Sequence, residues 1–332
     1  MFYSRLSAAV ALTVFAAGAL ADPQTASPLR IGPPFTFKKV IPEDFPDPAI
    51  AKFDGIWYAY ATVGNGINAQ LAMSQDGDNW TLVRGYETLP NPGLWADQRW
   101  PGIWAPDVAR VDSGKYVMYY SAKLATLDQH CIGVGYADAP TGPFVARSTP
   151  VICPATQGGA IDSASYQIDG KMYIVYKVDG NNIGHGGSCN NGIPPLVATP
   201  IMLQQVNPRD GFTKIGNPVK LLDRGPEDGP LVEAPSLVKT PDGRFVLFYS
   251  SNCFLDSKYH IAYAWADRLT GPYTKIASLA VTGMGGLYAP GGADVSPDGR
   301  KLAFHANNGT GGRAMYIANI AFDWRRRLVL SF

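Results

Sequence analysis

Residues 233–249, EAPSLVKTPDGRFVLFY, have the pattern of two β-strands joined by a tight turn. Phe245, Leu247 and Tyr249 fall on alternating positions, as a strand with two faces of different character requires. Between the two strands, Pro241-Asp-Gly243 is typical of a turn, because glycine readily adopts a positive φ. The chain repeats this hairpin, so the stretch predicts the unit from which the fold is built.

Five copies of the hairpin occur along the chain, of which the fifth is shorter and weaker. Each copy opens on a carboxylate, crosses a glycine turn and ends in an aromatic-rich strand. The opening acids, about 55 to 71 residues apart, are Asp47, Asp107, Asp162, Glu233 and Asp294. That spacing suits a four-stranded unit with long loops. We therefore predict an all-β chain that forms one domain, a five-bladed β-propeller, with blades at about 47–89, 107–151, 162–222, 233–280 and 294–332.

A propeller needs a strand that closes the ring, and two segments could supply it. One is the segment before Asp47, and the other is the C-terminal segment Arg327–Phe332. The pattern alone favours neither of them.

The first 21 residues have the features of a secretory signal. Arg5 supplies a positive start, residues 6–17 form a short apolar core, and Ala19-Leu-Ala21 fits the small-residue cleavage rule. The apolar run is too short to favour a membrane span. We expect residues 1–21 to be a signal peptide, residues 22–332 to be the catalytic propeller, and the protein to be secreted and not bound to a membrane.

The charge balance argues against nucleic-acid binding, and the cysteine content predicts disulfides. The 28 Lys and Arg nearly balance the 27 Asp and Glu, so there is no basic surface that predicts nucleic-acid binding. Four cysteines in an exported chain suggest two disulfides, with three pairings open. Two of the cysteines fall within the second predicted blade, which favours the pairs Cys131–Cys153 and Cys189–Cys253. We also expect a monomer.

The opening acids predict chemistry at the centre of the propeller. The first strand of each blade lines the central channel, so these acids should form a ring around one mouth of it. Like charges in such a ring shift one another's pKa values. Inverting glycoside hydrolysis needs two opposed carboxylates, one that protonates the leaving oxygen and one that activates water, and a third acid could tune the first. The alternative is that these acids cap turns or bind amides of neighbouring blades, as single Asp residues commonly do.

Four blocks of the sequence resemble the signature blocks of glycoside hydrolase family 43, in the family's order. They are Phe45-Pro-Asp-Pro-Ala-Ile50, Trp104-Ala-Pro-Asp-Val108, Ala160-Ile-Asp-Ser163 and Glu233-Ala-Pro-Ser236. That family contains arabinanases, α-L-arabinofuranosidases and β-xylosidases on a five-bladed propeller. The resemblance implies an enzyme that hydrolyses O-glycosyl bonds by an inverting acid/base mechanism.

The resemblance also implies roles for individual side chains. Asp47 matches the general base that activates water, and Glu233 matches the general acid. Asp162 matches the third carboxylate, which orients the acid and keeps it protonated, because a charged neighbour disfavours its ionisation. Trp104 resembles a substrate-binding residue, with packing inside the blade as the alternative. Asp107 resembles a residue that lines the pocket, with a turn-stabilising role as the alternative.

His305 follows the predicted strand 301–304 in the fifth blade. It resembles the histidine that, in many arabinan-active members, faces the channel axis near a bound calcium and its waters. The alternative is a histidine that is only hydrogen-bonded in the channel. Calcium prefers oxygen ligands, so an ion here would be held mostly through water. We expect no cofactor for the chemistry, consider a structural calcium in the channel, and interpret Asp294 as structural.

The expected substrate is an arabinose-containing polysaccharide or oligosaccharide of the plant cell wall, arabinan or arabinoxylan. The Glu-Ala-Pro and Trp-Ala-Pro-Asp blocks resemble arabinan-directed members, and the lack of a β-sandwich after the fifth blade counts against two-domain β-xylosidases. The insertion at 178–195 and the loop at 91–102 could wall off one end of a groove. This favours an exo-acting α-L-arabinofuranosidase or arabinanase over an endo-acting one.

Other activities stay open. Within the family they are a β-xylosidase and an arabinoxylan arabinofuranohydrolase. A non-catalytic sugar-binding propeller would repeat one pocket in every blade, whereas the candidate residues here differ from blade to blade. A fructan-active hydrolase commonly has Asn before its nucleophilic Asp, and Pro46 stands at that place here.

Overall fold

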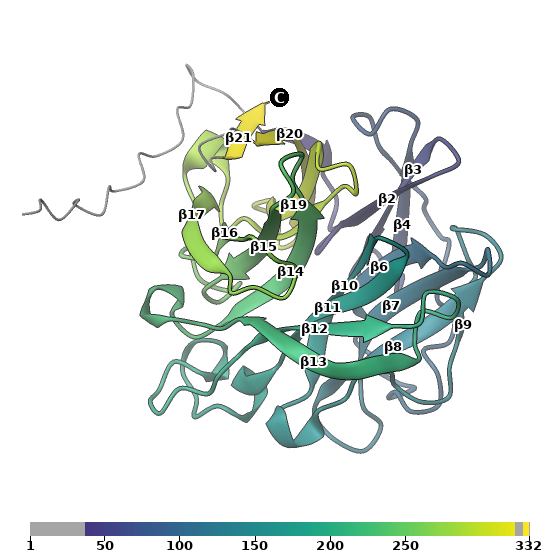
Figure 1. Ribbon diagram of the computed structural model, residues 1–332, viewed down its shortest axis with the longest axis horizontal. Helices are drawn as coiled ribbons and strands as arrows, with labels where there is room; N and C mark the ends of the chain where they lie inside the picture. Colours follow the sequence, from purple (N-terminus) through teal and green to yellow (C-terminus); the bar gives the residue numbers. More distant parts are fainter. Residues whose placement is uncertain (1–36, 323–327, 332) are drawn as a thin grey trace, which may run out of the picture.

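The computed structural model describes residues 37–322 and 328–331. Five antiparallel sheets stand around a common centre as the blades of a propeller (Figure 1). The prediction of an all-β, five-bladed propeller is therefore confirmed. The predicted signal peptide, residues 1–21, lies outside the described residues. In the described part of the chain, no helix has the length and apolar character that crossing a membrane requires.

The first four blades each consist of four strands in sequence order. Blade 1 contains β2 (Ala49–Phe53), β3 (Ile56–Ala61), β4 (Gln70–Ser74) and β5 (Thr81–Leu82). Blade 2 contains β6 (Trp104–Arg110), β7 (Tyr116–Lys123), β8 (His130–Ala137) and β9 (Val145–Ala146). Blade 3 contains β10 (Ala160–Ile168), β11 (Lys171–Val178), β12 (Ile201–Val206) and β13 (Lys214–Leu222). Blade 4 contains β14 (Val232–Lys239), β15 (Phe245–Ser251), β16 (His260–Ala266) and β17 (Thr274–Ala280).

Blade 5 is closed by both segments that the sequence left open. Its own strands are β18 (Gly291–Val295), β19 (Lys301–Asn307) and β20 (Arg313–Phe322). β1 (Lys38–Ile41) and β21 (Leu328–Ser331) both pair with β20, on the edge that β19 leaves free. β1 pairs around Ile317 and β21 around Ile320, so the two strands follow each other along β20. The start and the end of the propeller are therefore held together by backbone hydrogen bonds.

The described helices are short 3₁₀ turns in loops. They are η1 (Ala155–Gln157), η2 (Gly180–Ile183), η3 (Ser188–Asn190), η4 (Pro226–Asp228) and η5 (Met284–Gly286). Both predicted disulfides are present, Cys131–Cys153 and Cys189–Cys253. The second one joins η3 to the loop after β15, so it links the insertion of blade 3 to blade 4.

The hydrophobic core is divided among the junctions between blades. Five clusters of buried side chains each combine residues of two neighbouring blades. β7 and β15 are buried over almost their whole length, which explains why they read as continuous apolar and aromatic runs. Burying these runs requires the next blade, so each blade depends on its neighbour.

The innermost strand of each blade carries a bulge where it enters the channel. In blades 2 to 5 the pairing register slips between Trp104 and Asp107, Ile161 and Ala164, Glu233 and Ser236, and Gly291 and Asp294. A residue with positive φ opens each bulge, and the corresponding residue precedes β2 in blade 1. These five residues are Asp47, Ala105, Asp162, Ala234 and Gly292. A bulge of this kind re-aims the local backbone and side chains.

Four of these bulge residues donate their backbone N–H to a side chain of the preceding blade. The acceptor lies within two residues of the end of the second strand in each case. The bonds run from Ala105 to Thr62 Oγ1 (2.9 Å), Asp162 to Ser121 Oγ (3.1 Å), Gly292 to Ser250 Oγ (2.9 Å) and Asp47 to His305 Nδ1 (3.0 Å). At the fifth junction, Ala234 N–H instead donates to Asp162 Oδ2 at 2.9 Å. Each blade is thus fastened to the next beside the channel.

This arrangement predicts a stability effect. Ser121→Ala removes the acceptor of the Asp162 N–H and leaves a buried amide unpaired. The free energy of unfolding should fall by about 1–3 kcal/mol. Chemical denaturation can measure the change against Ser113→Ala, whose side chain is exposed. Equal stability of Ser121→Ala and the parent protein would contradict a role for this bond at the junction.

Candidate active site

The five acids that open the sequence repeat do not occupy equivalent positions. Asp47 and Asp162 are bulge residues, and Glu233 stands one residue before a bulge residue. Asp107 and Asp294 stand two residues after one, in blades 2 and 5. The acids do gather around one cavity, as the repeat predicts, but they stand at three different positions relative to the bulge. The repeat did not indicate this difference, because a bulge adds a residue to the strand without changing the pattern of residue types.

One cavity at the centre of the propeller joins four of these acids. The backbone around it is built from small residues, which leaves room beside the carboxylates. Its lining consists of Asp47, Pro48, Ala49, Ala105, Asp107, Asp162, Ser163, Ala164, Ala234, Pro235, Gly292, Ala293 and Asp294. Glu233 is next in sequence to the lining residue Ala234 and contacts the other groups described below.

Asp47 is surrounded by cationic and donor groups. Thr62 Oγ1 donates a hydrogen bond to its Oδ2 at 2.6 Å, and Arg313 Nη1 lies 3.3 Å from Oδ1. His305 Nδ1 lies 3.2 Å from the same Oδ1. Burial alone would raise the pKa of Asp47, but the charge of Arg313 and the hydrogen bond from Thr62 hold that pKa well below its usual range. Asp47 is therefore ionised at neutral pH and can accept a proton.

Asp162 has the opposite tendency. Burial raises its pKa well above the usual value, and the negative charge of Glu233 raises it further. Lys177 and the Ala234 N–H oppose this shift. The hydrogen bond from Ala234 also ties Asp162 to the backbone beside Glu233. Asp162 therefore retains its proton more readily than an exposed aspartate does.

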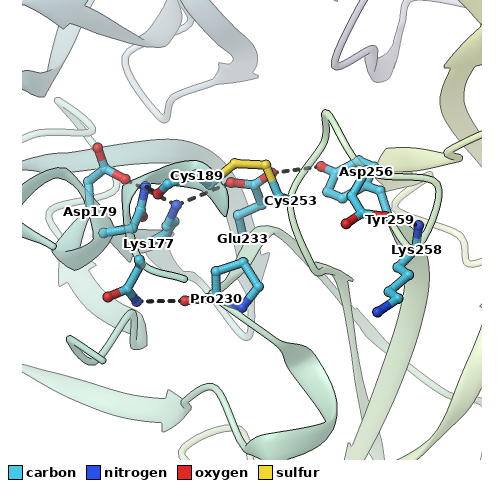
Figure 2. The surroundings of a disulfide bond; sticks show 11 residues. Lys177, Asp179, Cys189, Pro230, Glu233, Cys253, Asp256, Lys258 and Tyr259 are labelled. Atoms are coloured by element: carbon cyan, nitrogen blue, oxygen red, sulfur yellow. Dashed lines mark hydrogen bonds and ion pairs between the residues drawn. A yellow bond between two sulfur atoms is a disulfide. The ribbon is translucent and has the colours of Figure 1, made fainter. Parts of the chain in front are cut away.

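Glu233 is held from two sides, as Figure 2 shows. Tyr259 donates its hydroxyl to Oε1 at 2.8 Å, and Lys177 Nζ donates to Oε2 at 3.1 Å. Tyr259 lies so close to Gly291 that a Cβ there would fall 1.9 Å from its ring. Sequence reasoning missed both partners of Glu233. The sequence did contain a sign of Lys177, because a charged residue directly follows the apolar run 172–176. Nothing in the sequence distinguished Tyr259.

Asp107 and Asp294 bind groups of neighbouring blades. Asp107 Oδ2 accepts the Ser165 N–H of blade 3 at 2.7 Å. Asp294 accepts the Ile50 N–H of blade 1 and the Ser236 hydroxyl of blade 4, both at 2.7 Å. Burial raises the pKa of Asp107 to about 6 and that of Asp294 to about 7, where the charge of Asp107 adds to the effect. Asp107 thus lines the cavity and connects two blades, and Asp294 connects three.

Trp104 takes the position in blade 2 that Glu233 takes in blade 4. Its side chain is 36% exposed, and its ring stacks on His130 with centroids 3.6 Å apart. Burial lowers the pKa of His130 to about 4, so the imidazole behind the indole is neutral at neutral pH. A flat, partly exposed aromatic face is suited to a sugar ring, and the substrate-binding role of Trp104 stays a prediction.

His305 is engaged in a way that bears on the predicted calcium. Its Nδ1 accepts the Asp47 N–H, so in the neutral ring Nε2 carries the hydrogen, and Nε2 is buried without a partner. Among the described residues, no group of three or more His, Cys, Asp or Glu is arranged to hold a metal ion. These residues fit a directly bound calcium poorly. A water-coordinated calcium stays a prediction, and the chemistry below does not depend on it.

The insertion of blade 3 contacts loops of both neighbouring blades. Asn182 Nδ2 donates to the Asp128 carbonyl of blade 2 at 2.9 Å. The buried Asn191 donates to the Pro230 carbonyl of blade 4 at 2.7 Å, and Cys189 is bonded to Cys253. The segment that includes η2 and η3 is therefore tied to blade 2 and to blade 4.

The fold and the central acids define a five-bladed propeller with a buried carboxylate site. The chain belongs to glycosyl hydrolases family 43, whose family model matches residues 37–325. This confirms the resemblance seen in the sequence. A solved structure described as a thermostable family-43 glycoside hydrolase superimposes with a TM-score of 0.74 at 24% identity. The match covers 90% of this chain and 96% of that one.

Two curated relatives illustrate the range of the family. The chain is 27% identical over 285 residues to the extracellular endo-alpha-(1->5)-L-arabinanase 2 of Bacillus subtilis (strain 168), which covers 77% of this chain and 55% of the relative. It is 30% identical over 162 residues to a beta-xylosidase of Xylanibacter ruminicola, which covers 42% of this chain and 46% of the relative. The chain thus spans about half the length of the curated relatives it matches.

The surroundings of Asp47 give a testable expectation. Arg313→Met removes the cation that most strongly lowers the pKa of Asp47. Asp47 should then take up its proton at a higher pH, by about one unit or more. A ¹³C NMR titration of the Asp carboxyls can measure this shift, with the exposed Arg209→Met as the matched control. An unchanged titration of Asp47 in Arg313→Met would contradict the assigned cause.

Proposed function

We propose that the protein is a secreted, monomeric glycosidase that cleaves α-L-arabinofuranosyl linkages in arabinose-containing plant cell-wall polysaccharide. It would act as an α-L-arabinofuranosidase or an α-1,5-L-arabinanase, with inversion. The observation that carries the proposal is the contrast around one cavity between Asp47, which is held ionised, and Asp162, which retains a proton beside Glu233. Inverting hydrolysis needs one ionised base and one protonated acid.

The proposed chemistry follows from these protonation states. Asp47 takes a proton from water, whose oxygen attacks the anomeric carbon of the sugar. Glu233 gives its proton to the glycosidic oxygen as the bond between carbon and oxygen breaks. Asp162 holds the Ala234 N–H and so orients the backbone that carries Glu233. Asp47 ends protonated and Glu233 ionised, and exchange with solvent restores both.

Arabinan is favoured as the substrate by relatives and by the sequence blocks around the acids. The match to an extracellular endo-alpha-(1->5)-L-arabinanase includes most of the described propeller. The match to a beta-xylosidase is shorter, and it keeps xylosidase or arabinoxylan activity as the second candidate. The segment that includes η2 and η3 supports an exo mode of action, because its disulfide to blade 4 lies near Glu233 (Figure 2) and a segment there would limit how much polymer can extend past the site.

A product profile on linear α-1,5-arabinan tests this proposal, with xylo-oligosaccharides and arabinoxylan as parallel substrates. Arabinose as the sole early product is expected and would support the exo mode. A ladder of arabino-oligosaccharides would instead mean an endo-arabinanase. Release of xylose, or of arabinose from arabinoxylan alone, would support the second candidate, and no hydrolysis of any substrate would favour a sugar-binding propeller.

The acid role of Glu233 predicts the effect of a single substitution. Glu233→Gln keeps the shape of the side chain but removes the transferable proton. Turnover of arabinan should fall by about 10²-fold or more, while the circular dichroism spectrum and the thermal transition should stay close to those of the parent. Glu227→Gln, which changes an exposed acid on a loop, is the matched control. Full activity in a folded Glu233→Gln protein would refute the assignment.

A further inference from the structure

One position in each blade faces the bulge of the next blade, and in four blades its side chain accepts a hydrogen bond from that bulge. Within its own blade, the residue at this position is the cross-strand partner of the residue that precedes the bulge. Its occupants in blades 1, 2, 4 and 5 are Thr62, Ser121, Ser250 and His305, and each accepts the N–H of the next bulge residue. In blade 3 the occupant is Lys177, which pairs with Ile161. Lysine has three donors and no acceptor, so it cannot make this bond.

The exception falls at the junction that carries the proposed acid. Ala234 N–H, which lacks an acceptor at Lys177, donates to the Asp162 carboxylate instead. Lys177 is 0% exposed, and its ammonium lies 3.1 Å from Glu233 Oε2 and 3.0 Å from Asp179 Oδ1 (Figure 2). Burial opposes its charge, but Asp179, Glu233 and Asp162 outweigh burial and raise the pKa of Lys177. Lys177 therefore stays cationic at any working pH.

We propose that Lys177 is a positioning residue that determines which oxygen of Glu233 carries the transferable proton and at what pH that proton is lost. The proposal rests on the acid role of Glu233 proposed above. An ammonium cannot accept a hydrogen bond, so a proton on Oε2 facing Lys177 is excluded. The hydroxyl of Tyr259 faces Oε1 at 2.8 Å and can either donate or accept. The Lys177 contact thus disfavours a proton on Oε2 and favours one on Oε1, where the Tyr259 hydroxyl can accept it.

The charges around Glu233 act in opposite directions. The groups that face it are Lys177, Asp162, Tyr259 and His305, and Asp179 faces Lys177 from the far side. The Lys177 ammonium favours the ionised form of Glu233, whereas an ionised Asp162 favours the protonated form. Removing either charge should therefore shift the loss of the Glu233 proton, upward in pH for Lys177 and downward for Asp162.

The first test is Lys177→Met, which removes the charge and keeps an unbranched buried side chain. The alkaline limb of the pH profile of kcat/KM on arabinan should move up by about one pH unit or more. In the substrate-free protein, ¹³C NMR should show the Glu233 carboxyl ionising at a correspondingly higher pH, with the signal assigned by Glu233→Gln. Asp162→Asn should move both readouts down. A purely structural lysine would change stability and leave both readouts in place.

Asp179 supplies the matched controls. Asp179→Asn leaves Lys177 paired with Glu233 alone, so both readouts should move down. The double variant Lys177→Met/Asp179→Asn also removes the Asp179 charge, which Lys177→Met alone would leave without its cation. Both readouts should move up by less than in Lys177→Met. This variant serves if Lys177→Met alone fails to fold. Unmoved readouts in a folded variant that lacks Lys177 would overturn the proposal. Because the NMR titration needs no substrate, it decides the role of Lys177 even if arabinan is not hydrolysed.

Discussion

The structure depends on a hydrogen bond that crosses from each blade to the next beside the channel. A backbone N–H in a left-handed bulge donates to the side chain at the end of the preceding blade's second strand. The buried amide would be costly to leave unpaired, so this bond constrains both partners. Together with the hydrophobic clusters shared by neighbouring blades, it makes the blades one unit rather than five.

The same bulge generates the candidate site. It places Asp47 and Asp162 where their own N–H groups join two blades while their carboxylates face the cavity. Asp47 then meets Arg313 and His305, and Asp162 meets Glu233. The different neighbours shift the pKa values of Asp47 and Asp162 in opposite directions, although both residues are partly buried aspartates in equivalent positions. The site thus takes its chemistry from differences between blades that share one backbone geometry.

Much of the fold and part of the site could be predicted from local patterns. The hairpin repeat predicted five blades, and the two cysteines within one blade predicted both disulfide pairs. The acids Asp47, Asp162 and Glu233 could be named because they stand in recognisable blocks. Their partners Lys177, Tyr259 and Arg313 could not, because each comes from a different strand or loop with no motif of its own.

The sequence by itself determined the number of blades and favoured the disulfide pairs, because turn chemistry, strand alternation and cysteine spacing are local properties. It also identified the three acids proposed for catalysis, because they stand in short blocks that resemble those of a known family. Only the tertiary structure decided that Asp107 and Asp294 bind groups of neighbouring blades, since a bulge shifts a strand by one residue without changing the pattern of residue types. It also decided that β1 and β21 both pair with β20 and that Lys177 contacts Glu233. These contacts join residues far apart in the chain, and burial and charge at a contact exist only once the chain has folded.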